Sequence, residues 1–120
     1  MILADSSVWI DHLRRRDHRL AELLSREEIL IHSMVIGELA CGNLAKRQAL
    51  LWRWVRLPRL PAVSDETALR FIEERRLMSR GLGFVDVHLL AAVAAGKGAR
   101  LWTRDKPLAA VALELGLAVH

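Results

Sequence analysis

The sequence has a single cysteine, no long apolar run and no secretory leader pattern among its 120 residues. One cysteine excludes an intrachain disulfide and argues against a thiolate zinc site, because no second cysteine completes a pair. We predict instead that Cys41 is a small buried apolar residue. No apolar run approaches the roughly 18 residues that a membrane-spanning helix needs. The first residues, MILADSSVWIDHL, lack the basic segment and cleavage site of a secretory signal. We therefore expect a cytoplasmic protein with no membrane segment.

Acidic residues are absent from positions 41–64, whereas five basic residues and two tryptophans occur there. Over the whole chain, 18 Lys and Arg oppose 14 Asp and Glu, which gives a formal net charge of +4. Interleaved basic and aromatic residues are typical of nucleic-acid surfaces. An amphipathic helix with its tryptophans packed inward would give the same pattern. The segment therefore leaves both interpretations open for Trp52 and Trp54.

Short apolar segments alternate with helical patterns along the chain. Strands are expected at 1–5, 29–31, 99–103 and 117–119, and at most an edge strand at 57–63, which contains two prolines. Helices are expected between them: Ser6 or Ser7 caps the first, Ser33 caps a helix at 34–41, and Asp86 begins another. This alternation indicates a parallel sheet with both faces covered by helices. The length suits one α/β domain that spans residues 1–120.

Four of the acidic residues are isolated among apolar residues or at strand ends. Asp5 ends the first strand, and Asp105 follows the strand at 99–103. Asp86 opens an apolar helix, and Glu38 lies one turn into a helix, on a face that is otherwise apolar. Taken singly, Asp86 and Asp105 are explained as helix caps, and Asp5 could begin a turn. Glu38 has no such explanation, because a residue within a helix does no capping.

Taken together, the four acids predict a metal site. In a parallel α/β fold, the carboxyl ends of strands and the helix starts that follow them meet at one edge of the sheet. Clustered carboxylates repel one another strongly, and a divalent cation would compensate this repulsion. Oxygen ligands select Mg²⁺ or Mn²⁺ over zinc, and such sites orient phosphodiesters and activate water. The expected metal ligands and catalytic residues are Asp5, Glu38, Asp86 and Asp105.

Four segments resemble the motif blocks of PIN-domain proteins, in the same order and across the whole chain. They are DSSVWID at 5–11, ELACG at 38–42, GFVDVHLLAA at 83–92 and LWTRDK at 101–106. They look most like the VapC-type ribonuclease toxins of bacterial toxin–antitoxin pairs. The resemblance implies a three-layer α/β/α fold with a short central parallel sheet, and a Mg²⁺- or Mn²⁺-dependent endoribonuclease that acts on RNA. It also implies a homodimer and a VapB-like antitoxin that blocks the site.

The resemblance also assigns roles residue by residue, and it matches the acidic quartet to Asp5, Glu38, Asp86 and Asp105. Ser6 and Thr103 match hydroxyl positions beside the first and last acids, where such groups orient metal ligands. Pro107 occupies a position where some members carry a further acid. The number of metal ions, one or two, is therefore left open. His88 is interpreted as a structural residue or a substrate contact, and Asp11 as solvated or paired with an arginine. The basic residues expected to hold the RNA backbone are Arg14, Arg15, Arg104 and Lys106.

Three other functions are compatible with part of the sequence pattern. A phospho-accepting receiver module would need an acidic pair on the first strand and an Asp in mid-chain, and the acid-free segment 41–64 argues against it. A binding module that keeps the fold but little activity is a second alternative, although all four acids are present. A non-toxin PIN nuclease of RNA processing or DNA repair is a third, and the short chain favours the toxin over it.

Overall fold

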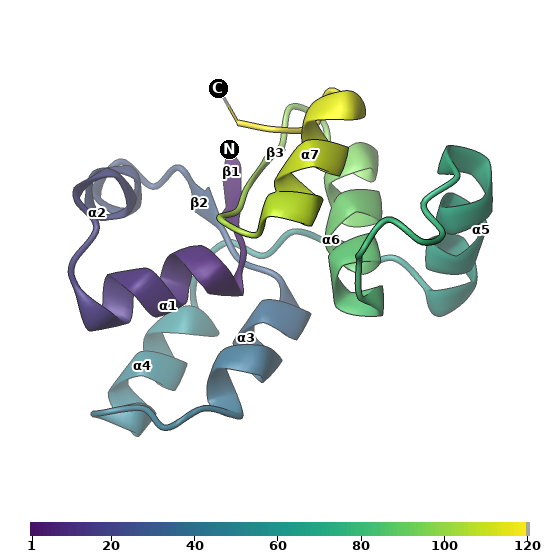
Figure 1. Cartoon of the computed structure of the whole chain (residues 1–120). Helices are drawn as coiled ribbons and strands as arrows, with labels where there is room; N and C mark the ends of the chain where they lie inside the picture. The colour runs from purple at the N-terminus through teal and green to yellow at the C-terminus, as the bar shows by residue number, and fades with distance from the viewer. Residues whose placement is uncertain (120) are drawn as a thin grey trace.

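A short parallel sheet lies at the centre of the computed structural model, which describes residues 1–119 (Figure 1). Its strands are β1 (Ile2–Ala4), β2 (Ile29–Leu30) and β3 (Arg100–Trp102), in the order β2-β1-β3. The first strand of the chain is therefore central, and it pairs in parallel with both neighbours. Isolated parallel bridges extend the sheet at its two edges and join Ile31 to Arg59 and Leu101 to Ala118. The strands expected at 57–63 and 117–119 are therefore reduced to these single bridges.

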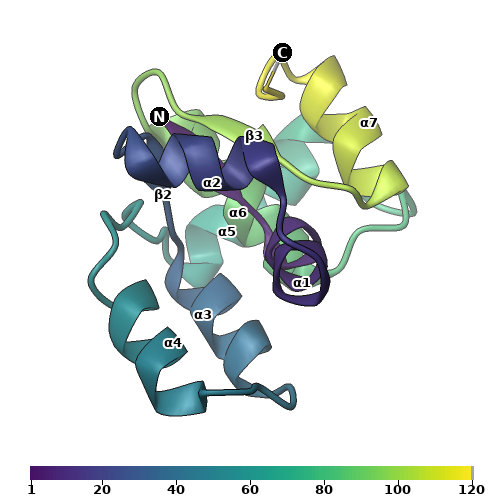
Figure 2. The same cartoon turned by 90° about the vertical axis from the view of Figure 1, so that its left-hand side faces the viewer.

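Within residues 1–119, helices cover the sheet on both sides, which confirms the expected α/β class. In Figures 1 and 2, α1 and α2 lie on one side of the sheet, and α6 lies on the other with α5 packed outside it. Helices α3 and α4 lie side by side beyond α1. The helices are α1 (Ser6–Arg14), α2 (His18–Ser25), α3 (Ser33–Ala40), α4 (Arg47–Trp54), α5 (Asp65–Arg75), α6 (Phe84–Ala95) and α7 (Lys106–Glu114).

The core is built from the strands and from α6. Leu3 and Ala4 of β1 are fully buried, and Leu101 of β3 is nearly so. Helix α6 is buried at every position from 87 to 93, because its apolar residues run all round the helix. None of the helices in the described part of the chain is long and apolar enough to cross a membrane. The sheet and α6 therefore form a rigid base for the loops at the carboxyl ends of the strands.

Helix α3 begins one residue earlier than expected, because a buried histidine caps it. The Nδ1 atom of His32, rather than Ser33, accepts a hydrogen bond from the Met34 N–H at 3.0 Å. Histidine is not among the usual capping residues, so the sequence pattern favoured the serine. The other end of α3 also differs from expectation: Cys41, predicted to be buried, follows the helix and is exposed.

The cap requires His32 to be neutral, because a protonated ring has no lone pair on Nδ1. The side chain is fully buried. Burial lowers the pKa of His32 below its ordinary value of 6.5, and the nearby charges of His88 and Arg59 lower it further. The folded protein therefore binds a proton at His32 less readily than the unfolded chain does.

We expect the free energy of unfolding to decrease as the pH falls through 6.5 towards the lower pKa of folded His32. The unfolded chain takes up the proton first, so acidification favours it. Urea denaturation at several pH values in this range measures the effect. His32→Asn keeps a capping oxygen and should flatten the dependence without abolishing it, because burial also lowers the pKa of His12. An identical pH dependence in the two proteins would show that His32 is not its source.

Candidate metal centre

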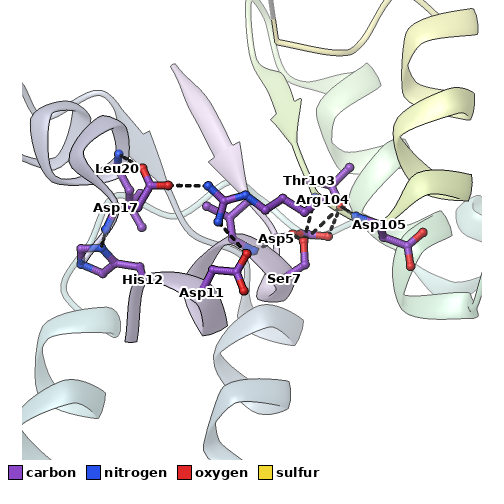
Figure 3. Close-up of polar contacts among 10 residues, drawn as sticks. Asp5, Ser7, Asp11, His12, Asp17, Leu20, Thr103, Arg104 and Asp105 are labelled. Carbon is purple, nitrogen blue, oxygen red and sulfur yellow. Dashed lines mark hydrogen bonds and ion pairs between the residues drawn. The ribbon is translucent and has the colours of Figure 1, made fainter. Parts of the chain in front are cut away.

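Asp5 lies directly after β1, and three donors hold its buried carboxylate, which is 6% exposed. Ser7 Oγ donates to Oδ1 at 2.5 Å, and the Val8 N–H donates to the same oxygen at 3.3 Å. Thr103 Oγ1 donates to Oδ2, as Figure 3 shows. Asp5, and not Ser6 or Ser7, is therefore the cap of α1. Because Thr103 follows β3, this carboxylate joins the ends of two adjacent strands.

Asp86 and Asp105 each accept a backbone N–H at the start of a helix. Asp105 caps α7, and its Oδ1 accepts from the Leu108 N–H at 3.0 Å. Asp86 is the third residue of α6 rather than its first, and its Oδ2 accepts from the Gly83 N–H at 3.0 Å. Helix N-termini stabilise negative charge. Each carboxylate is therefore stabilised by the helix start at which it lies. This stabilisation partly offsets the repulsion between the two negative charges.

Glu38 reaches towards α1 from the middle of α3. Ser6 Oγ donates to its Oε1 at 2.6 Å. Glu38 is exposed even though it shares a helix face with the buried Val35 and Leu39. Ser6 acts on Glu38 and not on the first acid, Asp5, beside which the sequence placed it.

The four acids are close enough to affect one another. Burial raises the pKa of Asp86, the hydrogen bond from Gly83 opposes this, and the negative charges of Asp105, Asp5 and Glu38 raise it further. In residues 1–119, however, no three His, Cys, Asp or Glu side chains are arranged to hold one metal ion. The quartet is thus an electrostatic cluster and not a preformed coordination sphere. Its oxygen donors suit a hard divalent cation, which would remove the repulsion that Asp86 experiences.

Ser7 is a site residue that the sequence pattern missed. Its hydroxyl donates to Asp5 and accepts from the Arg104 N–H at 2.9 Å. Thr103 was expected beside the last acid, and its hydroxyl does accept from the Asp105 N–H at 3.0 Å. A hydroxyl two residues after a strand-end acid is the signal that could have revealed Ser7. Such side chains commonly bond to groups at the first turn of a helix.

Two side chains expected near the substrate have partners within the protein. The guanidinium of Arg104 donates to Asp11 Oδ2 at 2.8 Å and to Asp17, so the expected pairing of Asp11 with an arginine is confirmed. His88 is 1% exposed, and its Nε2 lies 2.8 Å from Asp65 Oδ1. The geometry supports the structural interpretation of His88. The guanidinium of Arg104 is thus paired within the protein, although its side chain is 36% exposed.

The chain belongs to the PIN domain family, whose model matches residues 2–114. It is 50% identical over 119 residues to Ribonuclease VapC32 of Mycobacterium tuberculosis, in the two strains compared, and the match covers 99% of this chain and 96% of that protein. The fold resembles the crystal structure of PAE2754 from Pyrobaculum aerophilum, with a TM-score of 0.65 and 23% identity over 98% of this chain and 87% of that one. At that identity the likeness concerns the fold alone.

We expect Asp86→Asn to raise the free energy of unfolding of the metal-free protein at neutral pH. Asparagine keeps an oxygen for the Gly83 N–H, while the substitution removes a half-buried charge that three neighbouring acids disfavour. Urea denaturation in EDTA measures the change. Glu74→Gln, which neutralises an exposed acid on α5, serves as the control and should have little effect. Lower stability of Asp86→Asn in EDTA would argue against repulsion within the quartet.

Proposed function

We propose that the chain is a metal-dependent endoribonuclease toxin of a type II toxin–antitoxin pair. The observation that carries this proposal is that Asp5 and Asp105 follow the adjacent strands β1 and β3, and that both of them, with Glu38, act electrostatically on Asp86. The near full-length match to a protein named a ribonuclease supports the same activity. We also propose that it acts in the cytoplasm, where cellular RNA is available to it.

The proposed metal ion is Mg²⁺ or Mn²⁺, held by oxygens of Asp5, Glu38, Asp86 and Asp105. When bound, it supplies the charge that orients the phosphodiester, lowers the pKa of a bound water and stabilises the departing oxygen. The chain's own part is to aim the ligands. Ser7 and Thr103 each donate to one oxygen of Asp5, so the carboxylate plane cannot rotate freely. Ser6 holds Glu38 in the same way from the first turn of α1.

The RNA backbone is expected to lie along exposed basic residues next to this site. Lys106 follows Asp105 directly, and Arg14 and Arg15 lie exposed at the end of α1. Lys and Arg side chains that contact phosphates give sequence-independent affinity that falls with salt. Arg104, predicted from the sequence to belong to this set, is not part of the proposed RNA surface, because its guanidinium is paired with Asp11 and Asp17.

The direct test is cleavage of total cellular RNA by the purified protein in Mg²⁺, in Mn²⁺ and in EDTA. We expect discrete fragments that require a divalent metal. Asp5→Asn should reduce the rate by at least about 100-fold, because metal-assisted chemistry contributes several kcal/mol to the barrier and about 1.4 kcal/mol is tenfold. Glu74→Gln is the matched control and should cleave as the wild type does.

Each of the other results would count against part of the proposal. Cleavage that persists in EDTA or in Asp5→Asn would contradict the site assignment. No cleavage in either metal, by folded protein free of antitoxin, would favour a binding module that keeps the fold without the activity.

A VapB-like antitoxin is the proposed protein partner, and an apolar groove beside the site supports it. One hollow of about 600 Å³ is lined by Glu38 and by apolar side chains of α1, α3 and α4. A second, of about 510 Å³, continues past Trp9 and the exposed Trp52. Leu13 and Leu50 line both hollows. A segment seated there would lie against Glu38 and could block access to the quartet.

We expect Leu13→Asp to disrupt the complex with a VapB-like antitoxin partner, because it places a charge where apolar anchors bind. Co-purification of the two proteins measures complex formation. Leu113→Asp is the matched control: Leu113 lies on α7, outside both hollows, and is 73% exposed. An intact complex with Leu13→Asp would show that the groove is not the antitoxin site.

The family resemblance also leads us to propose a homodimer. Light scattering on the antitoxin-free protein tests this proposal.

A further inference from the structure

Arg104 lies between two residues of the candidate site but directs its side chain away from both. It is the single residue between Thr103 and Asp105, in the connection from β3 to α7. Figure 3 shows its guanidinium extending from this connection towards Asp11 and Asp17. The proposed function gives this side chain no part in binding metal or RNA, so its role needs a separate explanation.

The guanidinium of Arg104 joins three separate segments of the chain. One nitrogen donates to Asp11 Oδ2 on α1 at 2.8 Å, and the other donates to Asp17 Oδ2. Asp17 is itself fixed, because its Oδ1 caps α2 through the Leu20 N–H at 2.9 Å and its own N–H donates to His12 Nδ1 at 3.0 Å. The Asp17 side chain is only 16% exposed. The guanidinium thus has two carboxylate partners, one of which is anchored to a helix start, and it also lies 5.6 Å from the centre of the Trp102 ring.

The charges in this cluster favour the paired state. The N–H of Leu20, followed by Arg104, lowers the pKa of Asp17, and Asp17 in turn raises the pKa of Arg104. Two carboxylates on one guanidinium leave no excess positive charge for a phosphate. An RNA phosphate would have to displace Asp11 or Asp17 to reach Arg104.

The backbone of the same residue is attached to the candidate site. The Arg104 N–H donates to Ser7 Oγ at 2.9 Å, and Ser7 Oγ donates to Asp5 Oδ1 at 2.5 Å. The preceding residue, Thr103, donates to the other oxygen of Asp5. Arg104 therefore connects α1 and the start of α2, through its side chain, with the carboxylate of Asp5, through its backbone.

We propose that Arg104 is a positioning residue, whose pairing with Asp11 and Asp17 holds the β3–α7 connection so that Thr103, Ser7 and Asp105 keep their places around Asp5. This inference rests on the proposed function, because it concerns the geometry of the site that would cleave RNA. Asp11 and Asp17 then also help to position this connection, although neither belongs to the acidic quartet.

The test compares Arg104→Met with Asp11→Asn and Asp17→Asn. Asparagine at position 17 keeps the oxygen that caps α2, and it replaces the oxygen that accepts from Arg104 by an NH2 group, which cannot accept. If Arg104 acts by positioning, all three variants lower kcat by about tenfold, the usual loss when groups that orient metal ligands are removed. KM for RNA stays within about twofold, because binding of RNA is not the function removed. Arg104→Lys should recover part of kcat, since an ammonium can reach one carboxylate but not fork across two.

A direct contact between Arg104 and a phosphate predicts the opposite pattern. Arg104→Met would then raise KM and reduce the salt dependence of binding by about one phosphate contact. Asp11→Asn would lower KM, because it would free the guanidinium. Either result would overturn the proposal. Arg70→Met, which removes an exposed charge on α5, controls for net charge.

A readout that does not need activity separates this inference from the proposed function. Backbone NMR order parameters for residues 103–105 should fall from about 0.85, typical of rigid backbone, to below about 0.6 in Arg104→Met. Unchanged order parameters would overturn the positioning role even if the enzyme slowed. If the wild-type protein cleaves no RNA, the proposed function fails, and the order parameters still decide whether Arg104 holds the connection.

Discussion

The buried carboxylate of Asp5 is the contact on which the arrangement of the candidate site depends. A buried carboxylate without hydrogen-bond donors is strongly unfavourable. The donors here come from the first turn of α1 and from the residue after β3, which is 98 positions further along the chain. Satisfying Asp5 therefore requires β1 and β3 to be paired and the connection after β3 to be in place. The site can therefore have this geometry only when the sheet is intact.

The fold tolerates four neighbouring carboxylates partly because of where they lie on the helices. Asp5 and Asp105 cap α1 and α7, and Asp86 receives the N–H that precedes α6. Each of these positions carries unpaired backbone N–H groups and a positive end of a helix dipole. Glu38 lacks such support and instead uses the Ser6 hydroxyl and exposure to solvent. Capping and clustering are therefore not competing explanations of the acids.

Much of this architecture could be predicted from the sequence, because it depends on local patterns. The apolar segments at 1–5, 29–31 and 99–103 indicated parallel strands, and the isolation of the four acids indicated that they converge. The capping role of Asp5 was missed because the sequence pattern assigned this residue to the end of the first strand. That of His32 was missed because the neighbouring serine is a much commoner cap than histidine. The exposure of Glu38 was missed because helical spacing defines a face but not how far the neighbouring elements cover it.

The pairing of Arg104 could not be predicted for a different reason. Asp11 and Asp17 lie 93 and 87 positions away, and no local pattern links them to the LWTRDK segment. An arginine beside a candidate nuclease site therefore suggested a phosphate contact. The sheet order brings the ends of β1 and β3 together, and this proximity places the carboxylates of Asp11 and Asp17 within reach of the Arg104 guanidinium. Long-range partners of this kind decide which charges remain available to a ligand.

The central position of β1 has a consequence for how the protein is made. The ribosome synthesises β1 well before its partner β3, since β2 and helices α1 to α6 lie between them in the chain. Until residues 100–105 have been synthesised, Asp5 lacks Thr103, and the quartet lacks Asp105. A nascent or prematurely terminated chain therefore cannot assemble the site. On this topology the candidate site is absent until β3 and the residues that follow it have been synthesised and have folded against β1.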